Sequence, residues 1–353
     1  MRIAIIGNAS SPNVLSWIQG LRSVGADVHL ISVHSPANPD SKTHVIRMPR
    51  PLRKLAYFAA VPAARQLLQQ IQPDITVGYF ATGYGTLAML TGWKPLVIVT
   101  AGSDLFVAPY RNPVIRRILR LTLRRADLVV ALAPHMAEQA IRLGACSEKI
   151  FIQPHGIPLD KFGSARCAVP TEDDSLRVIS TRSLKPIYNI DRLIEAVALL
   201  DDLQTAASIV GHGPLRDSLT AQVQVCGIED RIVFTGRVSN AELPEILARH
   251  NVYVSLTDTE GVSASLLEAM AVGLTPIVRD IDANRYWITD GENGLLLPDS
   301  SPKAVADALR RVDNDMKIRQ RAYEQNPTIV RERGDLSCNS VRYIQKFRQF
   351  APT

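Results

Sequence analysis

Residues 259–273 read Thr-Glu-Gly-Val-Ser-Ala-Ser-Leu-Leu-Glu-Ala-Met-Ala-Val-Gly. In this stretch Gly261 lets the backbone turn, Ser263 is placed to cap a helix, and Gly273 is placed to end it. The apolar residues between the cap and the final glycine repeat at helical spacing: Leu266, Leu267, Met270 and Ala271. The stretch therefore predicts a loop that runs into a short helix.

The N-terminus of this predicted helix is suited to bind an anion. Unpaired N–H groups and the positive end of the helix dipole point there, and the loop before it leaves room for a ligand. Two carboxylates flank the position, because Glu260 lies in the loop and Glu268 lies about a turn and a half inside the helix. Carboxylates accept hydrogen bonds from sugar hydroxyls, so the pattern fits a phosphate that is joined to sugars on either side.

On these residues the chain resembles the retaining GT-B glycosyltransferases, family-4-like enzymes of the glycosyl transferases group 1. Their E-x7-E signature matches Glu260 to Glu268, and the likeness continues through residues 276–278 and 290–298. The resemblance implies that Glu268 holds the ribose of a nucleotide-sugar donor and that Glu260 holds the transferred sugar. The loop residues expected to face the donor are Gly261, Val262 and Ser263. The isolated spacing also fits an N-capped core helix with two solvated acids.

The composition is that of a soluble globular protein of two domains. The chain has 353 residues, of which 46% are hydrophobic and 21% are charged. No apolar run reaches the roughly 18 residues that a membrane-spanning helix needs. The cysteines show neither a C-x-x-C pair nor metal-ligand spacing, so we expect reduced thiols and a cytoplasmic location.

The net charge of +6 is concentrated in the first half of the chain. Residues 1–160 hold 17 Lys and Arg against 8 Asp and Glu, a balance of +9, whereas the remainder holds 23 against 26, a balance of −3. This asymmetry indicates an anionic partner for the first half, and nucleic acid and an acidic membrane are the two candidates.

Residues 113–125 predict an amphipathic helix that carries much of this charge. Its apolar side consists of Val114, Ile115, Ile118, Leu119 and Leu121. Its basic side, within an arc of roughly 100°, consists of Arg116, Arg117, Arg120 and Arg124. A second basic cluster consists of Arg47, Arg50, Arg53 and Lys54. Aromatic residues are not interleaved with these arginines, which disfavours single-stranded nucleic acid. We therefore expect peripheral binding to the cytoplasmic face of an anionic membrane and no nucleic-acid partner.

The first half of the chain alternates predicted strands and helices. Continuous apolar runs at 2–7, 27–32, 75–77, 96–99 and 128–132 are typical of buried parallel strands. This alternation predicts a doubly wound α/β domain. No G-x-G-x-x-G follows the first strand at Gly7, which argues against a dinucleotide-dependent dehydrogenase.

The second half repeats the pattern, with strands expected at 176–181, 206–210, 231–234, 252–256 and 276–278. Glycine, proline and acidic residues at 156–174 indicate a domain boundary. The resemblance implies an α/β fold of the GT-B type, two Rossmann-like doubly wound domains facing each other across a cleft. We expect an acceptor-binding domain at 1–160, a nucleotide-sugar-binding domain at 161–335, and a C-terminal helix at 336–353 that crosses back to the first domain. The residues expected to face that contact are Val341, Ile344, Phe347 and Phe350.

Two further loops of the second half are similar to the family's donor-binding loops. Residues 211–215 read Gly-His-Gly-Pro-Leu, follow a predicted strand and open a helix, and their glycines permit close approach of a ligand. The resemblance implies that this loop borders the nucleotide base together with residues 234–238. The residues expected there are Gly211, Gly213, Leu215, Arg237 and Val238. A plain strand-to-helix turn also fits this short motif.

Arg182 and Lys185 follow the predicted strand 176–181. The resemblance implies that these cations hold the donor diphosphate and offset the charge that builds on the leaving group. The spacing departs from the family, whose usual lysine position falls near Tyr188. Lys185 therefore also fits a solvated loop lysine.

Ser103 and Asp104 end the strand 96–99 in a Gly-Ser-Asp sequence that resembles the acceptor side of a subset of these enzymes. Histidines that many relatives carry nearby are absent, since Ala101 precedes this motif and the preceding strand ends in Gly-Tyr-Phe at 78–80. His155 lies in the expected linker, where we expect a hydrogen-bonding residue rather than a base.

The pair Asp280 and Asp282 forms a D-x-D sequence, which holds a metal in another glycosyltransferase fold. Here the pair follows a second-domain strand at a turn, and no cluster of oxygen ligands accompanies it. We expect no metal and no other cofactor.

The resulting prediction is a retaining hexosyltransferase that moves a sugar from a nucleotide-diphosphate sugar to a hydroxyl acceptor. The acceptor is expected to be lipid-linked, and the product to be a glycan, polysaccharide or cell-envelope glycolipid. One alternative is a non-catalytic homologue that binds a glycan or a partner protein. Another is a GT-B sugar-nucleotide epimerase or phosphorylase.

Overall fold

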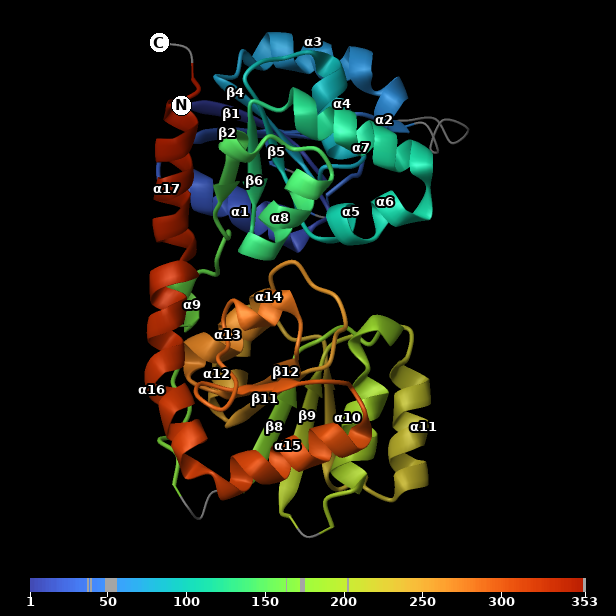
Figure 1. Cartoon of the computed structure of the whole chain (residues 1–353), viewed down its shortest axis with the longest axis vertical. Helices are drawn as coiled ribbons and strands as arrows, with labels where there is room; N and C mark the ends of the chain where they lie inside the picture. The colour runs from blue at the N-terminus through green and yellow to red at the C-terminus, as the bar shows by residue number, and fades with distance from the viewer. Residues whose placement is uncertain are drawn as a thin grey trace. The chain divides into compact units, whose positions relative to one another are not determined.

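The computed structural model describes residues 1–36, 38, 40–47, 56–162, 164–171, 175–201 and 203–351. The described chain divides into two compact units, residues 1–155 with 336–353 and residues 156–335 (Figure 1). The second unit thus begins at Gly156, the first residue of the predicted boundary region. Arg50, Arg53 and Lys54 of the second basic cluster lie outside the described residues.

A seven-stranded parallel sheet forms the centre of the first unit, in the order β3-β2-β1-β4-β5-β6-β7. Its strands are β1 (Arg2–Ile6), β2 (Asp27–Ser32), β3 (Thr43–Val45), β4 (Ile75–Tyr79), β5 (Leu96–Val99), β6 (Leu128–Ala131) and β7 (Ile150–Ile152). The strand order reverses between β1 and β4, and in such sheets ligands bind at the carboxyl ends of the strands beside this switch point.

Helices cover this sheet on both faces, as a doubly wound fold requires. They are α1 (Pro12–Ser23), α2 (Ala56–Ala59), α3 (Val61–Ile71), α4 (Tyr84–Thr91), α5 (Ser103–Phe106), α6 (Ala108–Arg111), α7 (Pro113–Arg125), α8 (Pro134–Arg142), the 3₁₀ helix η2 (Ser147–Lys149) and α17 (Leu336–Arg348).

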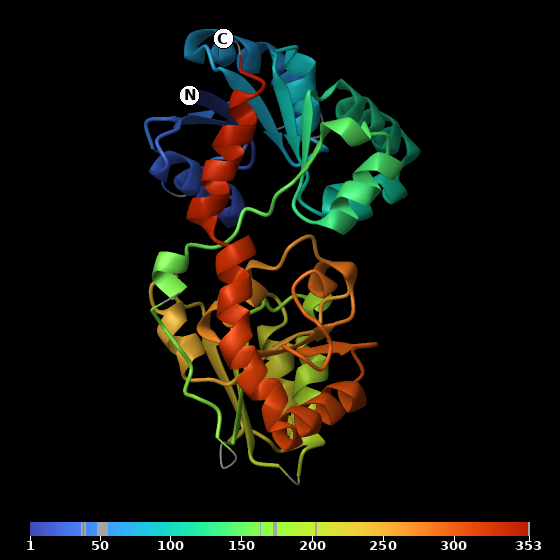
Figure 2. The same ribbon diagram turned by 60° about the vertical axis from the view of Figure 1, so that its left-hand side comes forward.

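The C-terminal helix α17 packs against α1 of the first unit (Figures 1 and 2). Gly20 permits this approach, because a Cβ at that position would lie 2.6 Å from Ser340 Oγ. The Tyr343 hydroxyl donates a hydrogen bond to the carbonyl of Gln153. Ile344 and Phe347 are buried, whereas Val341, which was expected to face this contact, is exposed, and Phe350 is half-buried.

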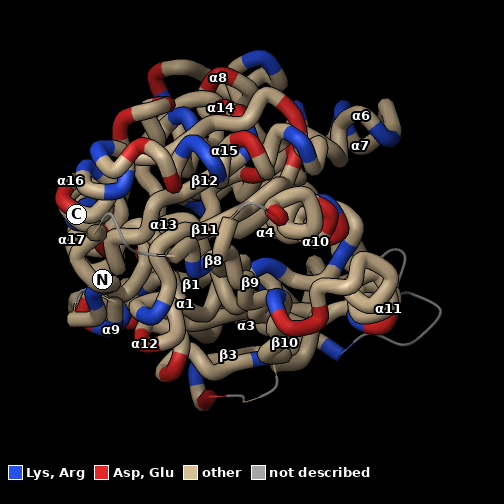
Figure 3. The backbone as a smooth tube through the Cα atoms, turned by 90° about the horizontal axis from the view of Figure 1, so that it is seen from below, with Lys and Arg blue, Asp and Glu red and all other residues tan. Residues whose placement is uncertain are grey.

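The apolar residues that helix α7 buries are not all those that the sequence placed on its apolar side. Asn112 caps it, and the buried residues are Leu119, Thr122 and Leu123. Val114 and Leu121, placed on the apolar side by the sequence, are 61% and 43% exposed. The exposed surface of α7 therefore combines arginines with apolar side chains, and the α6–α7 segment carries blue positions in Figure 3.

The second unit is built on a six-stranded parallel sheet in the order β10-β9-β8-β11-β12-β13. Its strands are β8 (Leu176–Ser180), β9 (Thr205–Val210), β10 (Ile232–Gly236), β11 (Val252–Ser255), β12 (Thr275–Arg279) and β13 (Leu295–Leu297). Here the strand order reverses between β8 and β11. The short edge strands β3, β7 and β13 were not expected as strands, because three residues are too few to show a periodic pattern.

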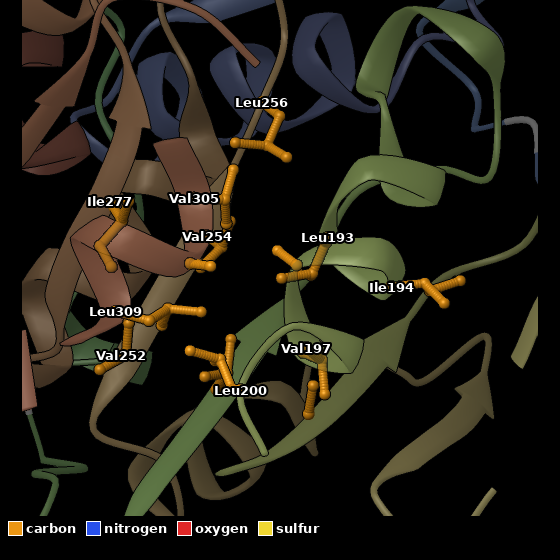
Figure 4. Packing of buried hydrophobic residues seen from close by; sticks show 14 of the residues in the cluster. Leu193, Ile194, Val197, Leu200, Val252, Val254, Leu256, Ile277, Val305 and Leu309 are labelled. Carbon is orange, nitrogen blue, oxygen red and sulfur yellow. The ribbon is translucent and has the colours of Figure 1, made fainter. Parts of the chain in front are cut away.

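Its helices are α9 (Leu159–Phe162), η3 (Pro186–Tyr188), α10 (Ile190–Ala198), α11 (Arg216–Cys226), α12 (Leu243–Ala248), α13 (Ala264–Val272), α14 (Asp282–Arg285), α15 (Pro302–Asn314) and α16 (Met316–Arg333). Figure 4 shows one side of the core, where Leu193 and Val197 of α10 and Leu309 of α15 lie near strand residues such as Val252 and Val254. Within the described ranges, no helix has the length and apolarity needed to cross a bilayer.

Candidate functional site

The guanidinium of Arg182 is the centre of a hydrogen-bonded cluster at the carboxyl end of β8. Its Nη1 donates to Ser263 Oγ at 2.8 Å and to Ser265 Oγ at 2.7 Å, and its Nη2 donates to Glu260 Oε2 at 2.5 Å. Arg182 is buried and the Glu260 side chain is 19% exposed. The structure thus brings the predicted phosphate-binding arginine to the E-x7-E motif, whose first glutamate, Glu260, lies 78 residues later in the chain.

The local structure of that helix, α13, follows from its sequence. Ser263 is the N-cap, as predicted, and its Oγ accepts a hydrogen bond from the backbone N–H of Leu266 at 3.3 Å. Gly273 ends the helix in the left-handed region, with φ at +94°. Sequence reasoning missed Ser265 and Tyr253, whose hydroxyl donates to Ser265 Oγ at 2.9 Å. A serine in a first helical turn carries no signal of such a partner.

Arg182 stays charged in this buried position. Burial acts to lower the pKa of the guanidinium, but Tyr253, Glu260 and Tyr188 more than offset it, so the net shift is upward. The ring of Tyr188 lies under the guanidinium, 4.3 Å from ring centroid to Cζ. Tyr188, near the position of the family's lysine, therefore contacts the arginine, which the sequence did not predict.

Glu268 lies on α13 and is half-buried. Burial raises the pKa of its carboxyl group to about 7, although the charge of Arg182 acts in the opposite direction. Its carboxylate makes no hydrogen bond or ion pair with another described residue. The carboxylate of Glu268 is therefore a hydrogen-bond acceptor that lies near the cation of Arg182 and is available to a ligand.

Gly211 and Gly213 are required by the contact between two loops. A Cβ on Gly211 would lie 2.4 Å from the carbonyl oxygen of Arg182, and one on Gly213 would lie 2.2 Å from that of Leu184. The N–H of Leu215 donates to the same Leu184 carbonyl at 3.1 Å. The close approach that these glycines permit is thus to the backbone at 182–184, and through it they position Arg182.

The remaining predicted donor-site residues lie on loops of the same unit. Lys185 is exposed on the loop after Arg182 and makes no side-chain hydrogen bond or ion pair with another described residue. Arg237 is exposed just beyond β10, and Val238 is half-buried next to it. Gly261 is buried and Val262 half-buried in the loop before α13.

Asp104, which is predicted to lie on the acceptor side, is a buried residue of the first unit. It is 0% exposed, and its carboxylate accepts hydrogen bonds from the backbone N–H groups of Ala81 at 2.7 Å, Ala101 at 3.1 Å and Gly102 at 2.9 Å. Burial raises its pKa and these N–H groups oppose the rise. Asp104 thus joins the loops that follow β4 and β5, whereas Ser103 is exposed. Both residues belong to the first unit.

His155 belongs to an aromatic cluster at the end of the first unit. Its Nε2 lies 3.1 Å from the Tyr79 hydroxyl, its Nδ1 lies 3.1 Å from the Tyr343 hydroxyl, and its ring stacks on Trp17 with centroids 4.6 Å apart. Burial lowers the pKa of the half-buried His155 to about 3. It is a neutral hydrogen-bonding residue, as the sequence predicted.

The D-x-D sequence forms ion pairs. Arg285 Nε lies 2.6 Å from Asp280 Oδ1, and its Nη1 lies 3.1 Å from Asp282 Oδ1. In the part of the chain that the structure describes, no group of three or more His, Cys, Asp or Glu side chains could hold a metal ion.

Comparison with known proteins identifies the family. Residues 165–328 match the glycosyl transferases group 1, and residues 2–132 match the glycosyl transferase 4-like family. The chain is 26% identical over 301 residues to the D-rhamnosyltransferase WbpZ of Pseudomonas aeruginosa, covering 82% of this chain and 78% of WbpZ. It is 24% identical over 282 residues to TuaC of Bacillus subtilis, a glycosyltransferase provisionally assigned to teichuronic acid biosynthesis, covering 76% of this chain and 68% of TuaC.

The fold matches a solved structure over its whole length. HepE of Anabaena in complex with UDP has a TM-score of 0.83 at 17% identity, covering 99% of this chain and 100% of HepE. The two family matches and the two Rossmann-like parallel sheets lead to one conclusion: the chain belongs to the GT-B glycosyltransferases of group 1.

Proposed function

We propose that the protein transfers a sugar from a nucleotide-diphosphate sugar to a hydroxyl acceptor and retains the anomeric configuration. The observation that carries the proposal is the buried Arg182, held by Glu260 and Ser263 at the N-terminus of α13. On the same helix lies the carboxylate of Glu268, which has no hydrogen-bond partner among the described residues. A cation and helix amides suit a diphosphate, and two carboxylates suit the sugars on either side of it. HepE, bound to UDP, supports a nucleotide donor.

In the proposed reaction the bond between the sugar C1 and the diphosphate oxygen breaks, and the diphosphate leaves with the electron pair. The acceptor hydroxyl attacks C1 from the face that the diphosphate leaves, and its proton passes to the departing phosphate oxygen. Arg182, Lys185 and the amides of Gly261–Ser263 offset the charge that builds on the leaving group. Glu268 accepts a hydrogen bond from the ribose, and Glu260 from the transferred sugar. Gly211, Gly213, Leu215, Arg237 and Val238 border the base.

The first unit is proposed to bind a lipid-linked acceptor and an anionic membrane surface. The exposed side of α7 carries Arg116, Arg117, Arg120 and Arg124 together with Val114 and Leu121. Basic residues attract anionic headgroups, and exposed apolar residues among them insert into the interface. TuaC and its provisional role in teichuronic acid biosynthesis support a product of the cell envelope.

Two measurements test the proposed reaction. A thermal-shift panel of nucleoside diphosphates identifies the base, since a ligand at 100 times its Kd adds about 2.7 kcal/mol of apparent stability. NMR of the product made from the α-linked donor then shows whether the new bond is α. An inverted product would refute retention. A protein that binds the nucleotide but neither transfers nor hydrolyses the donor would be a non-catalytic homologue.

A further inference from the structure

A second hydrogen-bonded cluster lies at the carboxyl end of β2 in the first unit. Ser32 is buried, and its Oγ accepts hydrogen bonds from the backbone N–H groups of Ala9 at 3.1 Å and His34 at 3.0 Å. The same oxygen lies 3.1 Å from the hydroxyl of Tyr84, and that hydroxyl lies 2.6 Å from Nδ1 of His34. Ala9 follows β1, Ser32 ends β2, and Tyr84 begins the helix that follows β4, so the cluster lies beside the β1–β4 switch point of the first sheet.

The protons available in this cluster determine the tautomer of His34. A hydroxyl has one proton to donate and two lone pairs. Ser32 Oγ already accepts two N–H bonds, so its proton goes to the Tyr84 oxygen. Among the described residues, Nδ1 of His34 is then the acceptor left within hydrogen-bond distance of the Tyr84 hydroxyl, so the Tyr84 proton goes to it. Tyr84 keeps this proton near neutral pH, because burial raises its pKa to about 12.

A neutral His34 whose Nδ1 accepts a hydrogen bond carries its own proton on Nε2. The side chain is exposed, and its Nε2 hydrogen bonds to no residue in the described part of the chain. His34 is therefore an N–H donor at the surface whose orientation is set by buried groups.

Aromatic side chains lie near Tyr84, whose ring centroid is 6.0 Å from that of His34. The ring of Tyr57 packs edge-on against Tyr84 with centroids 5.1 Å apart, and the next residue, Phe58, is 49% exposed. Gly83 makes room for Tyr57, because a Cβ there would lie 2.9 Å from the tyrosine ring. Aromatic side chains together with a few fixed polar groups are a usual way to bind a small ligand, and they suit a sugar, which has apolar C–H faces and oxygen atoms around its rim.

We infer that Nε2–H of His34 donates a hydrogen bond to an oxygen atom of a sugar-containing acceptor, whose ring packs on the aromatic surface of Tyr57 and Phe58. The inference rests on the proposed function and names the acceptor subsite. Since Nε2 already carries a proton, neutral His34 binds the acceptor and does not take a proton from its hydroxyl.

Two substitutions distinguish the role of Nε2 of His34, the outer nitrogen, from that of Nδ1, the inner one. His34→Gln keeps an amide N–H near the position of Nε2, whereas His34→Asn keeps a polar group near Nδ1 and loses the outer donor. Octyl glycosides of glucose, mannose and galactose serve as acceptor probes in a transfer assay. We expect the acceptor KM to rise roughly fivefold to tenfold in His34→Asn and to stay near the wild-type value in His34→Gln.

His44→Asn, on the neighbouring strand β3, is the matched control and should leave the acceptor KM unchanged. An unchanged acceptor KM in His34→Asn overturns the inference. A wild-type protein that binds no nucleoside diphosphate counts against the proposed function instead, because that measurement does not involve His34.

The tautomer can be measured without any acceptor. Long-range ¹H–¹⁵N NMR of the wild-type protein in mildly alkaline buffer should show His34 protonated on Nε2, and Tyr84→Phe should release this preference. A ring protonated on Nδ1 overturns the inference. Titration with an octyl glycoside that serves as an acceptor in the transfer assay should shift the His34 ring signals. If these signals do not shift, the inference is also overturned.

Discussion

The charge of Arg182 acts on the pKa of Glu268, yet the two residues differ in what surrounds them. Arg182 has three hydrogen-bond acceptors from the chain, whereas the Glu268 carboxylate has no donor among the described residues. A carboxylate that is desolvated without a partner destabilises the folded protein when it ionises. Such a group is typical of a binding site whose ligand supplies the missing donors.

Glu268→Gln should therefore stabilise the free protein in alkaline buffer. The folded-state pKa of about 7 lies above the ordinary value of 4.5, so the wild-type protein loses stability as pH rises from 4.5 to 7, and the loss is complete above 7. The amide of the variant does not titrate. The free energy of unfolding of Glu268→Gln should therefore rise above that of the wild type across this pH window, by roughly 1–3 kcal/mol at its upper end. Urea unfolding at both ends of the window measures it, and a difference that does not depend on pH would contradict the shift.

The two glutamates should differ in kinetics. We expect Glu268→Ala to raise the donor KM, since a carboxylate that holds the ribose binds ground state and transition state alike. Glu260→Ala should mainly lower kcat, by about tenfold or more, because Glu260 contacts the reacting sugar in the proposed reaction and because its loss leaves Arg182 without its ion-pair partner. Glu260→Gln, which keeps a hydrogen-bond acceptor, is the control. Kinetics unchanged in both alanine variants would remove these residues from the site.

At the scale of elements, the loop at 211–215 contacts the loop that carries Arg182, and through it is expected to affect the proposed donor site. Gly213→Ala would place a methyl group 2.2 Å from the Leu184 carbonyl oxygen, so the backbone at 182–184 must move. We expect a loss of about 1–3 kcal/mol of stability and weaker binding of nucleoside diphosphate, since Arg182 moves with its loop.

Gly227→Ala is the control for this prediction. Gly227 ends α11 with φ at +65°, and a Cβ there would meet nothing within 4 Å. That variant strains the backbone without touching the loops, so it should lower stability and leave nucleotide affinity unchanged. Equal nucleotide affinity in Gly213→Ala and wild type, measured by calorimetry, would show that the loop contact does not position Arg182.

The exposed side of α7 is the element expected to bind a membrane. Each Lys or Arg near an anionic surface contributes roughly 1 kcal/mol, so four arginines acting together hold a protein reversibly, and salt weakens the attraction. We expect flotation with anionic vesicles at low salt and none with neutral vesicles. Changing Arg116, Arg117, Arg120 and Arg124 to Gln should abolish it.

The apolar part of this surface has its own test. Changing Val114 and Leu121 to Ser should weaken vesicle binding without altering its salt dependence, because these exposed side chains contribute apolar area and no charge.

If the arginine variant still floats with anionic vesicles, the basic side of α7 is only solvated surface.

For the whole molecule, we expect sugar transfer to survive a strong chelator. The second unit offers the diphosphate a buried guanidinium and the N-terminus of α13, which supply positive charge without a metal. Activity measured with EDTA should match activity without it. A loss that magnesium or manganese restores would show that a metal takes part.

The sequence by itself determined the fold class and the elements that build the candidate site around Arg182. Continuous apolar runs indicated the main strands of two α/β sheets, and the motif at 259–273 indicated the loop, the cap at Ser263 and the end of the helix at Gly273. These features depend on short-range spacing, because a cap, a turn and a buried strand are each specified within a few residues. Edge strands of three residues carry too little pattern, and β3, β7 and β13 were missed for that reason.

Only the tertiary structure decided which distant groups meet. Periodicity shows that residues share a face, but not which other segment covers that face. The hydrogen bonds of Arg182 to Ser265, the burial of Asp104 under backbone N–H groups and the exposure of Val114 all depend on neighbours far away in the chain. The same holds for His34, whose tautomer follows from contacts with Tyr84, 50 residues later.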